Sequence, residues 1–183
     1  MKNSFFQVRP SYVIKTVVYT LYAIFLICIT SATLPSLGYN GAAPDLIICA
    51  VISLSYFESE KAASGFGMLA GFALEAVGST GFSILPLFYM LCGCVSWLLF
   101  SRALQKNFGA YMLYTALFMI VRTFISVIYI QLSAPNFALD LAFKNTLLPE
   151  YVLTVCSAAF VFALTFFISK KLSAHKDMAQ VKM

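Results

Sequence analysis

Apolar residues along this chain occur in long blocks separated by short polar or turn-forming segments. A helix that crosses a bilayer needs about 20 mostly apolar residues. The pattern therefore predicts an all-α integral membrane protein with six transmembrane helices, in which residues 1–183 form a single polytopic membrane domain. The six predicted spans are residues 16–34, 44–57, 62–77, 82–100, 109–130 and 148–168.

The composition supports this reading, because 61% of the residues are hydrophobic and only 10% are charged. Soluble domains usually carry about a quarter charged residues, so soluble enzymes are excluded. The first block has one alternative interpretation. Thr30, Ser31 and Ala32 loosely resemble a signal-peptide cleavage site, although the polytopic remainder of the chain favours a retained span.

The second block is short, and it begins with Pro44 and Asp45, which suit the first turn of a helix. Glu58, Glu60 and Lys61 separate it from the third block. If the second and third blocks both cross the membrane, these charges lie at its surface. A re-entrant hairpin is the alternative, but it would leave the charges in hydrocarbon, so two full spans are favoured.

The distribution of Lys and Arg predicts the orientation. With both termini in the cytoplasm, ten cations fall on the inside, Lys144 alone falls outside, and Arg122 lies within a span. Such an excess is the positive-inside signal of a multi-pass membrane protein. The cations are dispersed between apolar blocks, so the pattern does not favour nucleic acid as a partner.

The third span carries the most informative pattern in the sequence. Gly67, Gly71 and Glu75 recur at every fourth position, so they lie on one helix face. Glycines at this spacing allow another backbone to approach closely. We expect this face, with Arg122 and Asp45, to supply partner-binding or buried polar residues.

Glu75 and Arg122 each lie about 13 residues into an outward-running span, roughly 20 Å from the inner surface. Charges within a membrane usually face protein or water and often pair. The matched depth predicts an ion pair that locks the fold. A polar cavity or partner-docking site remains open as an alternative, and a proton relay is less favoured because Glu75 has no acidic or histidine neighbours in its span.

Catalytic and metal-binding patterns are not expected. The sole histidine, His175, lies in the tail, so a nucleophile would have no histidine base. The five cysteines lie inside apolar blocks, without a ligand spacing typical of metal sites. The sequence thus predicts a protein that is not an enzyme, with no cofactor and no metal.

Several short motifs together resemble the rod shape-determining protein MreD family. They are Pro44-Asp45-Leu46-Ile47 at the start of the second span, the GxxxG-bearing third span with Glu75, the turn Gly78-Ser79-Thr80-Gly81, and Pro149 at the start of the last span. The resemblance covers essentially the whole chain. It implies a non-catalytic membrane scaffold of the bacterial cell elongation machinery, whose partners are an MreC-like protein, MreB, RodA and a class B penicillin-binding protein.

The architecture implied by this resemblance is similar to the substrate-binding subunit of energy-coupling-factor transporters. The alternative function is therefore a small-molecule-binding membrane subunit of such a transporter. Those subunits dock their partner through an AxxxA face on the first span, whereas here Ala159-xxx-Ala163 lies in the sixth. This difference favours the scaffold.

Overall fold

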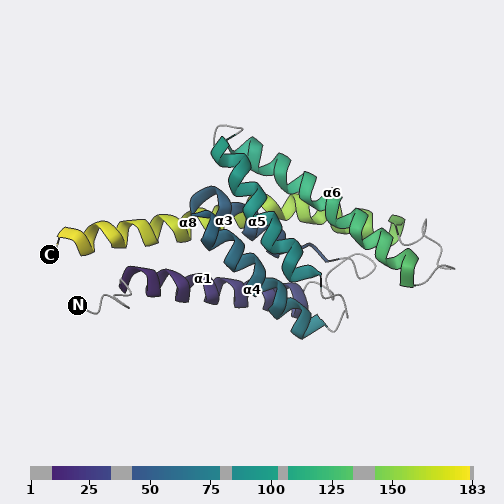
Figure 1. The fold of residues 1–183 in the computed structure, drawn as a ribbon, viewed down its shortest axis with the longest axis horizontal. Coiled ribbons are helices and arrows are strands. Elements are labelled where there is room, and N and C mark those ends of the chain that lie inside the picture. Colours follow the sequence, from purple (N-terminus) through teal and green to yellow (C-terminus); the bar gives the residue numbers. More distant parts are fainter. Residues whose placement is uncertain (1–9, 34–42, 79–83, 103–106, 134–142, 182–183) are drawn as a thin grey trace, which may run out of the picture.

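The computed structural model describes residues 10–33, 43–78, 84–102, 107–133 and 143–181. These residues form helices and no strand (Figure 1), so the all-α prediction is confirmed for them. The elements in chain order are α1 (Pro10–Cys28), the π-helical turn η1 (Ile29–Thr33), α3 (Leu46–Phe57), α4 (Glu60–Gly78), α5 (Leu85–Arg102), α6 (Phe108–Ser133), the π-helical turn η3 (Phe143–Leu147) and α8 (Leu148–Val181).

Four of the described helical stretches are long and apolar enough to cross a membrane: Ile14–Ser31, Leu85–Arg102, Phe108–Tyr129 and Phe143–Leu172. These four stretches indicate that the chain is a membrane protein. The other two predicted spans correspond to α3 and α4, and neither meets these criteria, so a count of six spans is not confirmed. The 12 residues of α3 extend only about 18 Å, which is short of a hydrocarbon core of about 30 Å.

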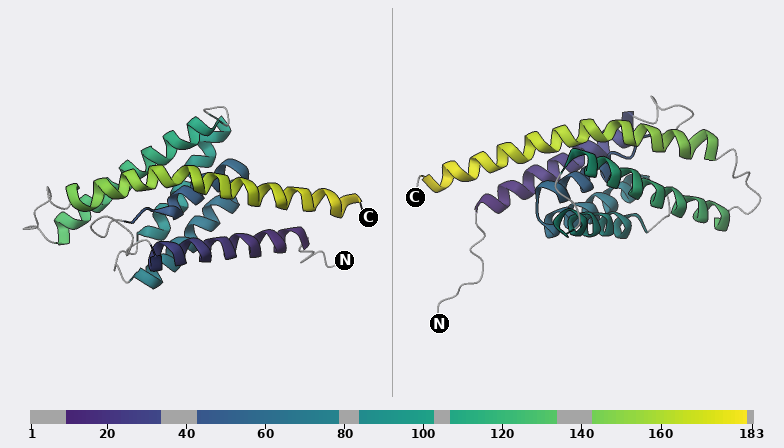
Figure 2. Two further views of the ribbon diagram at one scale, coloured as in Figure 1. Left: turned by 180° about the vertical axis from the view of Figure 1, so that it is seen from behind. Right: turned by 90° about the horizontal axis from the view of Figure 1, so that it is seen from above.

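The short helix α3 forms the centre of the bundle. It packs against α1, α4, α5, α6 and α8, and its first ten residues are all buried. A helix that is apolar on every side has no face suited to water, so it is stable only when other helices surround it. Figure 2 shows α8 as a long helix running along one side of this bundle.

Buried hydroxyl groups connect α3 to its neighbours. The Ser53 hydroxyl donates to Thr165 Oγ1 of α8 at 2.8 Å, and Tyr22 Oη of α1 lies 3.0 Å from the same oxygen. The Tyr111 hydroxyl of α6 donates to the Ala158 carbonyl of α8 at 3.0 Å. Hydrogen bonds between membrane helices contribute about 0.6 kcal/mol each on average, so together they fix how the helices are rotated.

The glycine face of α4 packs against α5. A Cβ atom added at Gly67 would lie 2.5 Å from the backbone oxygen of Tyr89, and one at Gly71 would lie 2.5 Å from the Cα atom of Pro86. Gly93 of α5 faces the backbone of Ala63 in the same way. The close approach expected at Gly67 and Gly71 is therefore present within this chain, and α5 covers the face that a partner would need.

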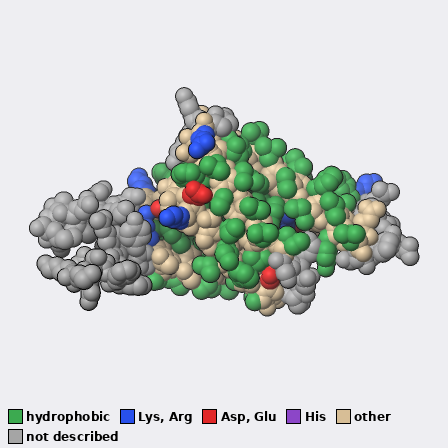
Figure 3. Space-filling model, viewed as in Figure 1, with side chains coloured by type: hydrophobic (Ala, Val, Ile, Leu, Met, Phe, Trp, Pro, Cys, Tyr) green, Lys and Arg blue, Asp and Glu red, His purple; other side chains and the backbone are tan. Residues whose placement is uncertain are grey.

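Large apolar side chains cover much of the face of the bundle shown in Figure 3, and exposed apolar side chains occur on α1, α4, α5, α6 and α8. Many are more than half exposed, and in water this surface would cost a large hydrophobic free energy. Their exposure fits a lipid environment. The most exposed examples are Leu21, Leu69, Phe124, Leu132, Phe160 and Phe167.

The N-terminal end of α1 and the C-terminal end of α8 lie at the same end of the molecule (Figure 1). The turn between α3 and α4 lies beside the N-terminal half of α1. Lys15 Nζ of α1 lies 2.6 Å from Glu58 Oε1, and the Tyr19 hydroxyl donates to the same oxygen at 2.8 Å. Glu58 directly follows α3, so this helix runs back toward the side on which α1 begins.

This arrangement predicts the accessibility of Ser59. In a variant without the native cysteines, we expect Ser59→Cys to react with a membrane-impermeant maleimide only from the cytoplasmic side. Lys176→Cys should react from the same side and Pro135→Cys from the opposite side; position 135 lies outside the described residues. Labelling of Ser59→Cys from the Pro135 side would contradict the expected orientation of α3.

Candidate functional site

The candidate site begins with Asp45 at the N-terminus of α3. Asp45 Oδ1 accepts hydrogen bonds from the backbone N–H groups of Ile47 at 3.1 Å and Ile48 at 3.2 Å. Aspartate is a favoured N-cap residue because it satisfies unpaired N–H groups and its charge suits the positive end of the helix dipole. Only 3% of Asp45 is exposed, so its charge needs partners inside the protein.

Arg122 supplies the opposite charge from α6. Its Nε atom lies 3.1 Å from Asp45 Oδ2, although the two are not aligned as a hydrogen bond. Its Nη1 atom donates to Glu150 Oε1 in the first turn of α8. One guanidinium group therefore joins two carboxylates and links α3, α6 and α8.

Two hydroxyl groups complete the cluster. The fully buried Tyr89 of α5 donates to Asp45 Oδ2 at 2.6 Å. Thr154 of α8 accepts from the Asp45 N–H at 2.9 Å and donates to the Glu150 carbonyl at 2.7 Å. Asp45 thus holds groups from α5, α6 and α8 around the start of α3, and we call Asp45, Tyr89, Arg122, Glu150 and Thr154 the charged cluster.

A cavity of about 230 Å³ adjoins the charged cluster. This volume is slightly below the range of about 300–1,000 Å³ that is usual for small-molecule sites. Polar and charged groups on its wall could hold several waters or a small polar ligand. It is lined by Thr30, Ala43, Pro44, Asp45, Leu74, Arg122, Thr146 and Glu150.

The predicted pair between Glu75 and Arg122 is wrong, because Arg122 is paired with Asp45 and Glu150. Glu75 lies elsewhere on α4, and its Oε1 atom is buried without a hydrogen-bond partner among the described residues. Matching the depth of two residues does not determine which way their helices are rotated. The N-terminal end of α3 lies beside α6, which places Asp45 next to Arg122.

The sequence indicates Asp45 and Arg122 as buried polar candidates, but it does not show that they pair. It does not predict Tyr89, Glu150 and Thr154 as members of the same site. Glu150 carried a usable signal, since an acidic residue after Pro149 marks the start of a helix and needs a cation. Tyr89 and Thr154 carried no such signal, because hydroxyl groups are common in membrane helices.

Two of the buried tyrosines, Tyr89 and Tyr114, are expected to respond differently when their hydroxyl group is removed. Tyr89→Phe should lower the free energy of unfolding by about 1.5–3 kcal/mol, because it removes a hydrogen bond to a charged acceptor. Tyr114→Phe is the matched control, since the buried Tyr114 hydroxyl has no partner among the described residues. It should be neutral or stabilising. Denaturation in detergent measures both, and equal losses in the two variants would contradict the role of Tyr89.

The fold and the cluster define the class of this protein: a helical membrane protein whose buried charges join its helices to one another. Comparison with protein-family models, with curated proteins and with solved structures gives no match.

Proposed function

We propose that this protein is a non-catalytic membrane scaffold of the bacterial cell elongation machinery, similar to the rod shape-determining protein MreD. In this role it maintains cell shape by linking an MreC-like protein and MreB to the lateral peptidoglycan synthases, RodA and a class B penicillin-binding protein. The motifs that carry the resemblance include Pro44 and Asp45, and Asp45 is the residue around which the charged cluster forms.

The observation that carries this proposal is that the charges of the cluster pair with one another. Asp45 accepts hydrogen bonds from two backbone N–H groups and the Tyr89 hydroxyl, and it pairs with the Arg122 guanidinium. Glu150 pairs with another nitrogen of the same guanidinium. Groups that serve catalysis or transport need a free position for a substrate. A cluster whose members bind one another instead stiffens the bundle, which suits a protein that presents apolar helix faces to other membrane proteins.

The proposed location is the bacterial cell membrane, with both termini in the cytoplasm. The excess of Lys and Arg in the segments assigned to the inside supports this orientation. The common position of the two terminal helix ends is consistent with it.

The cavity beside Arg122 favours a second candidate, a small-molecule-binding subunit of an energy-coupling-factor-type transporter. Its volume of about 230 Å³ and its Thr30 and Thr146 side chains could hold a small polar ligand. The scaffold remains the better candidate because the charged groups on the cavity wall already pair with one another.

Purification of the full-length protein from its native membrane in mild detergent distinguishes the two candidates. We expect an MreC-like protein to co-purify, and depletion of the protein to turn rod-shaped cells round. A tagged membrane protein of similar size from the same cells is the control. Recovery of an ATPase with a transmembrane transporter module, and unchanged cell shape on depletion, would overturn the scaffold and support the transporter subunit.

A further inference from the structure

A groove of about 660 Å³ runs between α1 and α4, away from the charged cluster. On α1 it extends from Lys15 to Ile27 and on α4 from Lys61 to Ala73, about 18 Å along each helix. The two helices diverge toward the end that carries the terminus of α1 (Figure 1). Exposed side chains on both helices, such as Ile24 and Leu69, line the groove, so it is open to the surroundings of the bundle.

The lining of the groove changes character along its length. The end near the start of α1 has charged and hydroxyl side chains, which are Lys15, Thr16, Tyr19, Thr20, Glu58, Ser59 and Lys61. The remainder is apolar and is formed mainly by Ala23, Ile24, Ile27, Phe66, Leu69, Ala70 and Ala73. A groove with a polar mouth and an apolar interior matches a molecule with a polar head and a hydrocarbon tail.

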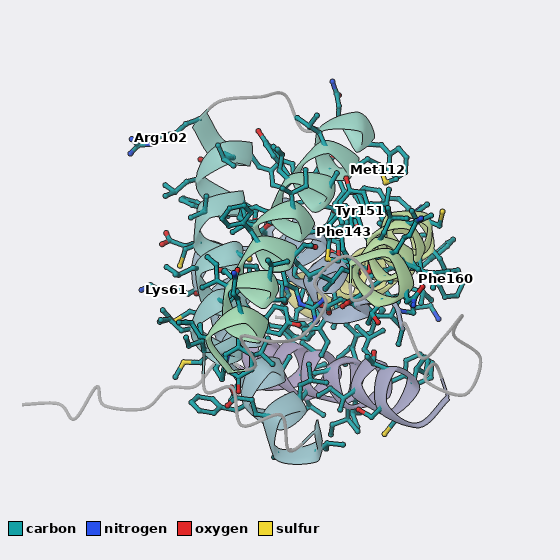
Figure 4. All side chains as sticks on the ribbon, turned by 90° about the vertical axis from the view of Figure 1, so that its right-hand side faces the viewer. Lys61, Arg102, Met112, Phe143, Tyr151 and Phe160 are labelled. Atoms are coloured by element: carbon teal, nitrogen blue, oxygen red, sulfur yellow. The ribbon has the colours of Figure 1, made fainter. Side chains whose placement is uncertain are left out.

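The charges at the mouth favour an anion. Glu58 is already neutralised, because it accepts from both Lys15 and Tyr19. Lys61 is exposed and forms no ion pair with the described residues, and it points outward from α4 (Figure 4). Glu60 begins α4 but does not line the groove. The lining thus carries one more cation than anions, beside the positive end of the α4 dipole.

The lining favours a lipid over a protein helix. It places the exposed Lys61 at one end and a continuous apolar surface along the remainder. An anionic headgroup suits the first part, and a flexible acyl chain can follow the second.

We propose that this groove binds an anionic phospholipid from the leaflet that meets the N-terminal end of α1. The phosphate lies near Lys61 and Lys15, and an acyl chain follows the apolar surface from Ala23 to Ala73. Basic pockets between membrane helices recognise anionic headgroups through the same combination of charge and apolar contact. This assignment does not depend on the scaffold role.

Gly65 offers a way to close the groove without disturbing the protein. It lines the groove, and a Cβ atom added there would meet nothing within 4 Å. Gly65→Leu should therefore fold, since leucine also has the higher helix propensity, while its side chain fills the space for the acyl chain. Lys61→Gln removes the charge at the mouth. Lys171→Gln is the matched control, because Lys171 is exposed on α8 and lies outside the groove.

Native mass spectrometry of the full-length protein in detergent, with added phosphatidylglycerol or phosphatidylcholine of identical chains, tests the proposal. We expect the unaltered protein to retain phosphatidylglycerol preferentially. Lys61→Gln should reduce that preference about fivefold, and Gly65→Leu should reduce retention of both lipids. Lys171→Gln should behave as the unaltered protein, and thermal unfolding should verify that each variant is folded.

Three results would overturn the assignment. The first is unchanged phosphatidylglycerol retention in both groove variants. The second is an equal loss in Lys171→Gln, which would indicate general attraction to basic surface. The third is loss of a co-purifying protein from Gly65→Leu with lipid retention intact, which would show that the groove takes a protein segment instead.

Discussion

Arg122→Gln is expected to lower the free energy of unfolding by about 3–5 kcal/mol, the usual cost of removing one partner from a buried ion pair. Arg122 is the cation shared by Asp45 and Glu150, so its loss leaves both carboxylates without a compensating charge. The same change should lower the amount of protein in the membrane. Denaturation in detergent measures the first effect, and quantitative blotting of membranes measures the second.

Neutralising the carboxylates should restore much of the loss. The triple variant Arg122→Gln, Glu150→Gln, Asp45→Asn leaves no charge in the cluster, and asparagine at position 45 still caps α3. Glu75→Gln is the matched control, because Glu75 takes no part in the cluster. It should be neutral alone and should not rescue Arg122→Gln. Rescue by Glu75→Gln, with no rescue by the cluster substitutions, would contradict the observed pairing.

Gly71→Leu is expected to have a comparably large effect. Even a single methyl group at this position would lie 2.5 Å from the Pro86 Cα atom, so α4 and α5 would have to separate. Overpacking of a well-packed interior commonly costs about 1–3 kcal/mol, and a leucine against rigid backbone should reach the upper end of this range or exceed it. We expect little folded protein, measured as the monodisperse fraction after detergent extraction.

Gly65→Leu is the natural control for this experiment, since it adds the same side chain to the same helix where there is open space. It should be extracted as well as the unaltered protein. If Gly71→Leu were equally abundant and monodisperse, the contact between α4 and α5 would not be as close as described. Loss of partner capture at normal abundance would indicate instead that this face binds another protein.

The sequence predicted the helices well because lipid imposes a simple rule: backbone groups must be satisfied within the segment, and outward side chains must be apolar. A described helix overlaps each of the six predicted segments. The same rule does not reveal how deep a helix sits when other helices shield it. The burial of α3 depends on side chains from five other helices, so its position could not be derived from its own residues.

The charged cluster was predictable only in part. Asp45 and Arg122 stood out because charges in apolar blocks are costly and need partners. The choice between Glu75 and Glu150 as a partner of Arg122 depends on rotation about the helix axes. That rotation is set by contacts such as Gly71 against Pro86 and Tyr111 against Ala158, which join residues far apart in the chain. The acidic residue nearest in estimated depth was therefore the wrong choice.

The burial of α3 on every side also determines how the chain can vary. On α6 or α8, an outward position such as Phe124 or Phe160 is largely free of contacts with the other helices of this chain, so apolar side chains of different sizes fit there without changing the packing of the bundle. From Ile47 to Ser53 no position has an exposed side, and a change of volume in either direction leaves a hole or a clash. The most hydrophobic helix, α3, is thus the one that tolerates substitution least. Attempts to diversify or stabilise this protein should begin on its surface and leave its centre unchanged.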